Sequence, residues 1–206
     1  ALSPQRAWQY EVGARDGAGL LQWELSLYDI ELRDELLNQN VQPFPGAPFT
    51  VPTYRNAPRT RHAGIEAGLA LLCGSVSGRA SYAFNRFTFV NDPQFRDNDL
   101  PGAPSHYLAA EATWTHRAGL SLTPTIEWSP SRYHVNSANS DTNEPWAALG
   151  ARVDWSVERA GATVFLHARN LTDARYSASV QVDNAVGRYF EPADSRSFYV
   201  GMRWSR

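Results

Sequence analysis

The chain contains no lysine, so all 19 of its basic residues are arginine. This absence excludes a Schiff-base lysine, a phosphate-binding lysine of a Walker loop and a serine–lysine catalytic pair. Cys73 is the only cysteine, which excludes an internal disulfide and a metal site with several thiolate ligands. The 19 basic residues are balanced by 21 acidic ones, and the net charge of −2 lacks the basic excess of nucleic-acid-binding proteins.

Long apolar runs are also missing. No stretch approaches the roughly 18 consecutive apolar residues of a membrane-spanning helix, and residues 1–6 lack the apolar segment of a signal peptide. The mean hydropathy is only −0.43. A membrane β-barrel is compatible with this value, because its strands alternate apolar and polar residues. With 43% hydrophobic residues among 206, the chain is expected to fold.

Alternation of apolar and polar residues recurs in about nine segments of roughly ten residues. In 21–28, for example, Leu and Trp occupy the odd positions up to residue 27, and polar residues occupy the even positions. The other segments lie at about 6–15, 64–71, 76–85, 108–115, 120–128, 147–157, 162–169 and 197–204. Helical spacing is nearly absent. The pattern predicts an all-β, antiparallel fold whose sheet has one oily and one polar face.

The expected connections alternate strictly between short and long. Short hairpin turns are expected at 16–19, 73–75, 117–119 and 158–161, and long segments at 31–60, 89–105, 130–145 and 171–194. Outer-membrane barrels have short periplasmic turns on one rim and long external loops on the other, whereas a soluble sandwich has no reason to sort its loops. The sequence therefore favours a transmembrane β-barrel over a β-sandwich.

An odd number of strands would put the two chain ends on opposite sides of a membrane, whereas a complete bacterial barrel usually has an even number. We therefore expect residues 1–206 to be the C-terminal nine or ten strands of a larger barrel, with its N-terminal part outside this chain. A tenth strand would lie in 31–60, where Ile30, Leu32, Leu36 and Leu37 extend the second strand.

Several motifs resemble those of TonB-dependent outer-membrane receptors. The most specific are near the C-terminus: Asn-Leu-Thr-Asp-Ala-Arg-Tyr at 170–176, Gly-Arg-Tyr-Phe-Glu-Pro at 187–192, and 195–204, which ends in Val-Gly-Met-Arg-Trp. Upstream, 8–15 resembles the strand that opens this half of the barrel, 56–66 resembles an Asn-Ala…Arg…Gly-Val-Glu lead into another strand, and 100–106 resembles a Pro-x-x-Pro-x-His lead into a third. The motifs follow the family's order along the chain.

This resemblance implies a barrel of roughly 22 strands, a globular plug and a TonB-contacting box. The plug and the box are absent from these residues, so the chain alone is not expected to transport anything. The implied function is TonB-dependent uptake of a scarce bulky solute across the outer membrane of a Gram-negative bacterium. A ferric siderophore is the favoured solute, and haem, cobalamin or a quinone-type cofactor remain open. TonB, outer-membrane lipid and the barrel-assembly machinery are the implied partners, without a bound cofactor.

Four residues of the C-terminal motifs are expected to have structural roles: Asn170, Asp173, Gly201 and Trp204. Asn and Asp at a strand end bond neighbouring backbone groups more often than they bind ligands. Trp204 belongs to a set of exposed aromatic candidates for the two girdles at the lipid interfaces. The others are Trp8, Tyr10, Trp23, Trp114, Trp128 and Trp155.

Ligand contacts are expected from the long outer connections, where polar and aromatic side chains can converge on a large solute. The candidates are Tyr54, Arg55, Arg59, Tyr133, His134, Arg188 and Tyr189. Arginine suits anionic chelates through charge-assisted bonds, and aromatic rings suit catecholate or planar groups. The alternative is that these residues are ordinary solvated loop residues.

Catalytic and metal-binding patterns are not evident. The five histidines are dispersed, without His-x-His or His-Glu-x-x-His spacing, so no metal site is expected. No Gly-x-Ser-x-Gly motif occurs, although Ser105-His106 keeps an outer-membrane lipid hydrolase as a weaker alternative. A small passive pore or structural barrel is a further alternative. We therefore expect a non-enzymatic protein.

Overall fold

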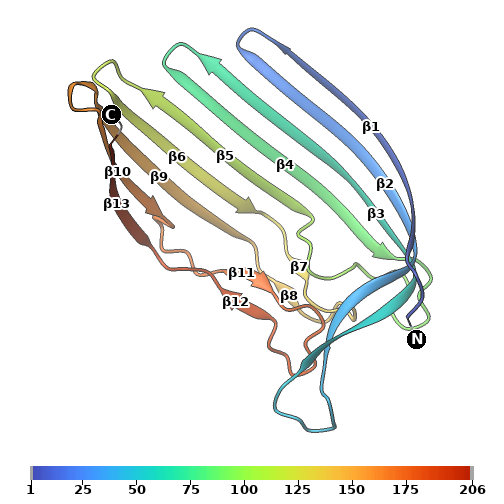
Figure 1. The fold of residues 1–206 in the computed structure, drawn as a ribbon. Helices are drawn as coiled ribbons and strands as arrows, with labels where there is room; N and C mark the ends of the chain where they lie inside the picture. Colours follow the sequence, from blue (N-terminus) through green and yellow to red (C-terminus); the bar gives the residue numbers. More distant parts are fainter. Residues whose placement is uncertain (1, 205–206) are drawn as a thin grey trace.

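The structure is a computed structural model that describes residues 2–204. Most of the chain forms one sheet of nine antiparallel strands, in which each strand pairs with the next one along the chain. Their bounds are β1 Arg6–Ala18, β2 Leu21–Val41, β3 Val51–Cys73, β4 Val76–Phe89, β5 His106–Thr115, β6 Leu120–Ser129, β9 Trp146–Val157, β10 Ala162–Arg169 and β13 Ser197–Trp204. The sheet is a curved, open wall with β1 and β13 at its two edges (Figure 1). The prediction of an all-β antiparallel fold is confirmed.

The remaining elements are small and lie in the connections. β7 (Tyr133–His134) pairs with β8 (Thr142–Asn143), and β11 (Ser177–Val180) pairs with β12 (Phe190–Pro192). A 3-10 turn, Glu158–Ala160, joins β9 to β10. Within residues 2–204, no helix has the length and apolar character needed to cross a membrane.

The connections are sorted by length between the two ends of the sheet, as the sequence predicts. The hairpins β1–β2, β3–β4, β5–β6 and β9–β10 turn at one end, which we call the short-connection rim (Figure 1). The segments 42–50, 90–105, 130–145 and 170–196 lie at the other end, the long-connection rim. The first turn is tighter than expected, because pairing continues to Ala18↔Leu21 and only Gly19 and Leu20 remain outside it.

The expectation that 31–60 is a long connecting segment is wrong. β2 and β3 pair from Leu21↔Leu71 to Val41↔Val51, so the connection itself is only 42–50 and the ladder extends far beyond the neighbouring strands. Asp34, with a positive φ of 53°, and Pro58 opposite it are the only positions left out of this ladder. The main sheet has nine strands within the described part of the chain, so 31–60 adds length to two strands and not a tenth strand.

The two faces of the sheet differ in polarity. On the convex face, one apolar row runs across six strands in register: Val76, Trp114, Leu122, Val153, Leu166 and Val200. Many of these side chains are exposed, Val200 at 77% of its surface and Trp204 at 66%. On β9 the apolar face runs from Ala147 to Val157, which at about 3.3 Å per residue and about 45° of tilt spans roughly 23 Å. That height is close to the apolar band of roughly 25 Å in outer-membrane barrels.

The expected girdle aromatics occupy two levels of the convex face. Trp23, Trp114, Trp155 and Trp204 lie on strand segments next to the short-connection rim, whereas Trp8, Tyr10 and Trp128 lie toward the long-connection rim. All of these rings are at least 41% exposed. Such positions suit amphipathic rings at the boundaries of a lipid bilayer.

The packed core lies at the long-connection rim and not behind the apolar face. Ala57, Phe89 and Leu100 are buried there. Leu37, Phe87 and Phe95 pack against them. The other buried apolar residues are Leu32, Ala47, Val135 and Ala168. Burial is therefore concentrated where the long connections meet the extended parts of β2 and β3.

Candidate functional site

The concave face of the sheet carries a large hollow with many charged side chains, which we call the polar hollow. It has a volume of about 1390 Å³ and is lined from β1 to β10 and by residues 192–195. Its charged residues are Arg15, Asp16, Glu24, Arg79, Glu111, Glu127, Arg152, Arg169 and Asp194. Arg79 pairs with Glu111 at 2.8 Å and Arg152 pairs with Asp154 at 2.7 Å. The concave wall is thus a water-facing surface with compensating charges, as its alternating sequence predicts.

The last long connection contributes to this hollow. Tyr176, which follows β10, stacks on Trp146 with ring centroids 4.3 Å apart. Both Tyr176 and Glu127 line the hollow. Burial, together with the nearby Glu127 carboxylate, raises the pKa of the Tyr176 phenol. The Tyr176 ring thus anchors this connection over the β6–β9 side of the concave face.

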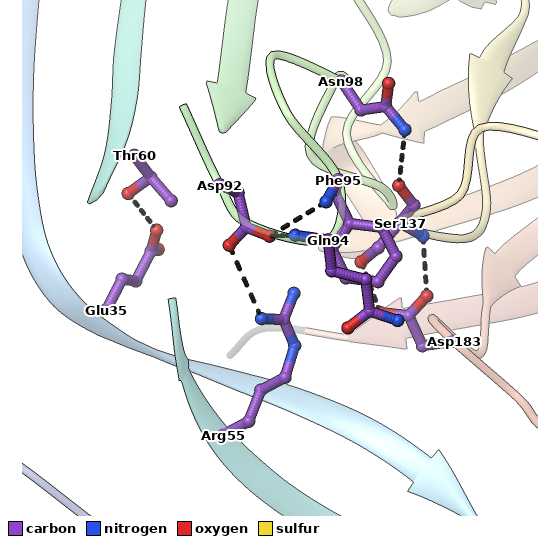
Figure 2. Close-up of polar contacts among 9 residues, drawn as sticks. All are labelled: Glu35, Arg55, Thr60, Asp92, Gln94, Phe95, Asn98, Ser137 and Asp183. Carbon is purple, nitrogen blue, oxygen red and sulfur yellow. Dashed lines mark hydrogen bonds and ion pairs between the residues drawn. The ribbon is translucent and has the colours of Figure 1, made fainter. Parts of the chain in front are cut away.

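The long connections are joined by buried hydrogen bonds. The Asp183 carboxylate accepts hydrogen bonds from the backbone N–H and the Oγ–H of Ser137, both at 2.6 Å (Figure 2). Asn98 Nδ2 donates to the Ser137 carbonyl at 2.9 Å, and the Asn40 N–H donates to the Asp183 carbonyl at 3.3 Å. Ser137 is completely buried. These contacts tie three long connections and the end of β2 into one unit, which we call the loop cluster.

A second buried group fixes the connection between β4 and β5. Asp92 is 4% exposed, and its Oδ1 accepts the N–H groups of Gln94 and Phe95, both at 2.9 Å (Figure 2). Its other oxygen lies 3.9 Å from Arg55. The Arg55 guanidinium also lies over the rings of Phe89 and Phe95, at 5.4 and 4.9 Å. This arrangement holds the connection against β3.

A third polar group lies on the concave side of the extended ladder. The Glu35 carboxylate accepts a short hydrogen bond from the Thr60 hydroxyl (Figure 2). It also lies 3.3 Å from His62 Nε2. Burial opposes ionisation of Glu35, but the hydrogen bonds with His62 and Thr60 outweigh it and hold the pKa of Glu35 below its usual value. His62 in turn stacks on Phe87 at 4.5 Å. The group therefore links β2, β3 and β4 above the polar hollow.

Three of the ligand candidates lie on β3 and not in a connecting loop. Tyr54 is 58% exposed, whereas Arg55 is largely enclosed by the Asp92 group. Arg59 lies on the convex side and donates to Glu31 at 3.0 Å. The sequence predicts all three as ligand contacts of the long outer connections, whereas the structure places them on β3 in separate surroundings.

The other four candidates lie in the long connections. Tyr133 accepts a hydrogen bond from Asn143 at 2.8 Å, and His134 Nε2 lies 3.8 Å from Asp99. The Tyr189 hydroxyl accepts from Asn136 within the loop cluster. Arg188 is exposed beside it. The structure thus places Tyr189 and Arg188 with the loop cluster, while Tyr133 and His134 form part of the small β7–β8 sheet.

The residues of the C-terminal motifs make local contacts. Asn170, in a left-handed conformation with φ of 48°, bonds the backbone of Ala174 at both of its amide atoms and also the Asp194 carbonyl. Asp173 accepts the Arg196 N–H at 2.9 Å. A Cβ at Gly201 would lie 2.4 Å from the Phe165 ring. Trp204 pairs with Ala162 on the exposed convex face.

No group of three or more His, Cys, Asp or Glu side chains suited to a metal ion occurs within residues 2–204. His106 Nδ1 lies 2.7 Å from the Tyr82 hydroxyl. The Ser105 carbonyl accepts a hydrogen bond from the Asn85 N–H. The Ser105-His106 pair thus has a structural environment in the described part of the chain.

The sequence reasoning missed the residues that hold the long connections together. Asp92, Ser137 and Asp183 look like ordinary polar loop residues. Asp183 contacts Ser137, 46 positions away, and Asn40, 143 positions away. The only available signal was the abundance of Asn and Asp in these segments, which are residues that bond backbone groups in turns. That signal predicts turns but not which turns contact one another.

Solved structures of two uptake receptors and a copper transporter resemble this fold. The ferric yersiniabactin uptake receptor FyuA from Yersinia pestis matches with a TM-score of 0.77 and 17% identity, over 96% of this chain and 29% of that one. The ferric-catecholate import receptor Fiu from E. coli K12 matches at 0.73 and 19%, over 98% and 28%. The copper transporter OprC matches at 0.77 and 18%, over 98% and 32%. The chain thus spans about a third of the length of these proteins.

A family model described as "TonB dependent receptor-like, beta-barrel" matches residues 1–171. This match covers the sheet from β1 to β10, with the part of the polar hollow that these strands line and three of the four long connections. The sorted connections, the exposed apolar face and the polar concave face agree with it. The chain therefore belongs to the TonB-dependent receptor β-barrel family.

Proposed function

We propose that this chain is the C-terminal part of an outer-membrane receptor that imports a scarce bulky solute with energy supplied through TonB, and that the solute is a ferric siderophore. The observation that carries the proposal is the loop cluster, which stands at one rim of a wall whose concave face is polar. A solute captured at this rim would meet the hollow next. The family match and the likeness to siderophore receptors support the same proposal.

The hollow of about 1390 Å³ is an open concavity of the wall, which the proposed plug would occupy, so a solute would first meet the residues of the long-connection rim. Arg188 and Tyr189 are the best-placed of the predicted ligand contacts, because they lie beside the loop cluster. Arginine binds anionic chelates through charge-assisted hydrogen bonds, and a tyrosine ring suits planar catecholate groups.

The open sheet supports a larger barrel. In this structure β1 and β13 each have a neighbour on one side only, and an unpaired strand edge is costly in a membrane because its backbone groups lack partners. We therefore propose that further strands close the wall, toward a total of roughly 22, and that a plug fills it. TonB would act through that plug. Outer-membrane lipid and the barrel-assembly machinery complete the proposed partners, and no catalytic role is proposed.

The experiment uses the complete receptor in a strain that lacks its own copy. Cells take up ⁵⁵Fe bound to a panel of catecholate, hydroxamate and carboxylate siderophores, with and without TonB. We expect TonB-dependent uptake of at least one ferric siderophore. Arg188→Gln should reduce that uptake more than Arg117→Gln, which changes another exposed arginine, at the short-connection rim. Uptake that is independent of TonB, or uptake of copper or haem alone, would overturn the proposed function or its solute.

A further inference from the structure

The convex face of β1–β4 changes character toward the long-connection rim. Outward positions on β2 run from apolar to charged in the order Leu25, Leu27, Asp29, Glu31, Arg33. The pairing with β1 and β3 continues through this change without a break. One continuous backbone therefore carries an apolar surface up to residue 27 and a charged surface from residue 29. A wall that passes from hydrocarbon into a headgroup layer needs this order.

Arginine dominates the charged part of this face. Arg6, Arg33 and Arg59 stand directly opposite one another across β1, β2 and β3. Opposed residues on neighbouring strands have Cβ atoms about 5 Å apart, and like charges placed there repel. Arg61 on β3 and Arg86 on β4 continue the same surface. We call these five residues the arginine patch.

Two carboxylates neutralise part of the arginine patch. Glu31 accepts a hydrogen bond from Arg59 at 3.0 Å, and Asp29 accepts two from Arg61 at 2.9 and 2.6 Å. With five guanidinium groups and two carboxylates, the patch has a formal excess of three positive charges. This excess is local, because the chain as a whole carries −2.

Three arginines of the patch, Arg6, Arg33 and Arg86, have no carboxylate partner in the described part of the chain. Arg33 lies over the ring of Trp8, 5.5 Å from its centroid, which leaves its N–H groups available at the surface. Arg86 is exposed, and no ion pair to it occurs in the described part of the chain. Guanidinium groups in such a position bind phosphate through paired hydrogen bonds.

A groove joins the arginine patch to the apolar face. It has a volume of about 650 Å³. Its apolar part is formed by Val12, Leu27, Ile65 and Phe84, and its charged part by Asp29, Arg61 and Arg86, with Tyr10 and Thr88 beside them. The groove thus offers hydrocarbon contact at one end and guanidinium groups at the other. A molecule that fits both ends has an acyl chain and an anionic headgroup.

We propose that the arginine patch and this groove bind the phosphate-bearing headgroup of an acyl lipid, with the acyl chain lying along the apolar part of the groove. The proposal rests on the outer-membrane location proposed above, and it adds a lipid site on the convex face, outside the path of the solute. The charge excess, the direct opposition of three arginines and the amphipathic groove each favour this occupant. The bound phosphate would relieve the repulsion within the row.

The test measures lipid binding to the complete receptor in detergent. The probes are lipid A with two phosphates, the same lipid after removal of its phosphates, and inorganic phosphate. The variant Arg33→Gln/Arg86→Gln removes two charges and keeps both ion pairs of the patch. Its matched control, Arg117→Gln/Arg159→Gln, removes two exposed arginines at the short-connection rim. Native mass spectrometry reports the bound fraction.

Each charge near a lipid surface contributes about fivefold in binding, so the patch variant should bind phosphorylated lipid A about thirtyfold more weakly. The control should stay within about twofold of the parent, and the dephosphorylated lipid should not distinguish the proteins. Equal binding by both variants would overturn the proposal. Inorganic phosphate binding as tightly as the lipid would also overturn it, by showing a soluble-anion site.

Siderophore uptake is measured on the same variants. Charge-dependent lipid binding without any TonB-dependent uptake would refute the proposed function and leave the lipid site standing. Uptake with no charge-dependent lipid binding would refute the lipid site alone. Binding of a second protein to the patch in place of lipid, seen as a mass shift of the purified receptor that only the patch variant loses, would overturn the choice of occupant.

Discussion

The contact between Asp183 and Ser137 should decide whether the loop cluster behaves as one unit. In Asp183→Asn the side chain keeps its size, and asparagine tolerates the left-handed backbone at this position, where φ is 51°. The amide has one acceptor oxygen, so it can serve only one of the two Ser137 donors that the carboxylate accepts at 2.6 Å. Ser137 is completely buried, and water cannot replace the missing partner.

The cost follows from this geometry. A buried donor left without a partner costs about 1–3 kcal/mol, and loss of charge from the remaining bond adds about 1 kcal/mol. We expect opening of the cluster to become easier by about 2–4 kcal/mol, which raises amide exchange of the clustered segments by roughly 30-fold to several hundredfold. Hydrogen–deuterium exchange mass spectrometry of 133–141 and 180–189 measures this effect in the complete receptor. Asp194→Ala, an exposed carboxylate in the same connection, is the control.

A double-mutant cycle tests the mechanism. Ser137→Ala removes the Oγ–H donor, so in the double variant the amide oxygen is free to accept the remaining backbone N–H of residue 137. The two substitutions together should therefore cost less than the sum of their separate effects. Exchange that is unchanged in Asp183→Asn, or effects that simply add, would refute the reasoning that the Asp183 carboxylate bridges the long connections.

Three further predictions concern stability. The pKa of Glu35 in the folded protein lies below its usual value of 4.5. Its contribution to stability is therefore present above pH 4.5 and is lost as the pH falls through the folded pKa. In Glu35→Gln, the rate at which a protease cleaves the extended β2–β3 ladder should depend less on acid pH. Gly201→Val should destabilise the barrel in urea by about 1–3 kcal/mol, because its side chain meets the Phe165 ring, and Phe165→Leu should recover part of the loss. Arg55→Lys should lower the protection of residues 90–100 from hydrogen exchange by about 1–2 kcal/mol, because lysine keeps the charge but loses the planar stacking on Phe89 and Phe95. Tyr54→Phe, which changes an exposed side chain, should not lower it.

The strands of the main sheet could be predicted because each must show one face to an apolar solvent and the other to a polar one. That requirement produces strict alternation, as in 21–28 and 197–204, and the long and short connections follow from it. The extensions of β2 and β3 could not be predicted in this way. Beyond Leu27 the convex side of β2 carries Asp29 and Glu31 while the concave side packs Leu32, so the polarity pattern reverses although the backbone pairing continues.

The candidate site was harder to predict than the fold. Its organisation depends on contacts between connections that are far apart in the sequence, such as Asn40 with Asp183, and these leave no periodic pattern. Arg55 shows the difficulty at a single residue. In the sequence, an arginine that binds a solute cannot be distinguished from one that packs against Phe89 and Phe95, as Arg55 does in the structure. Residue type indicates what a side chain can bind, but only the fold determines what it meets.

The reversal of polarity along β2 and β3 also sets how deep the wall can sit. If the wall sank by two residues, Asp29 and Arg61 would enter the hydrocarbon edge, and charges on that face cost from about 0–1 kcal/mol near the interface to 2–4 kcal/mol at the midplane. If it rose by the same amount, Leu27 and Ile65 would be lifted into water. Vertical drift is thus opposed in both directions, and the long-connection rim, where we propose that the solute is captured, is kept at a constant height above the lipid.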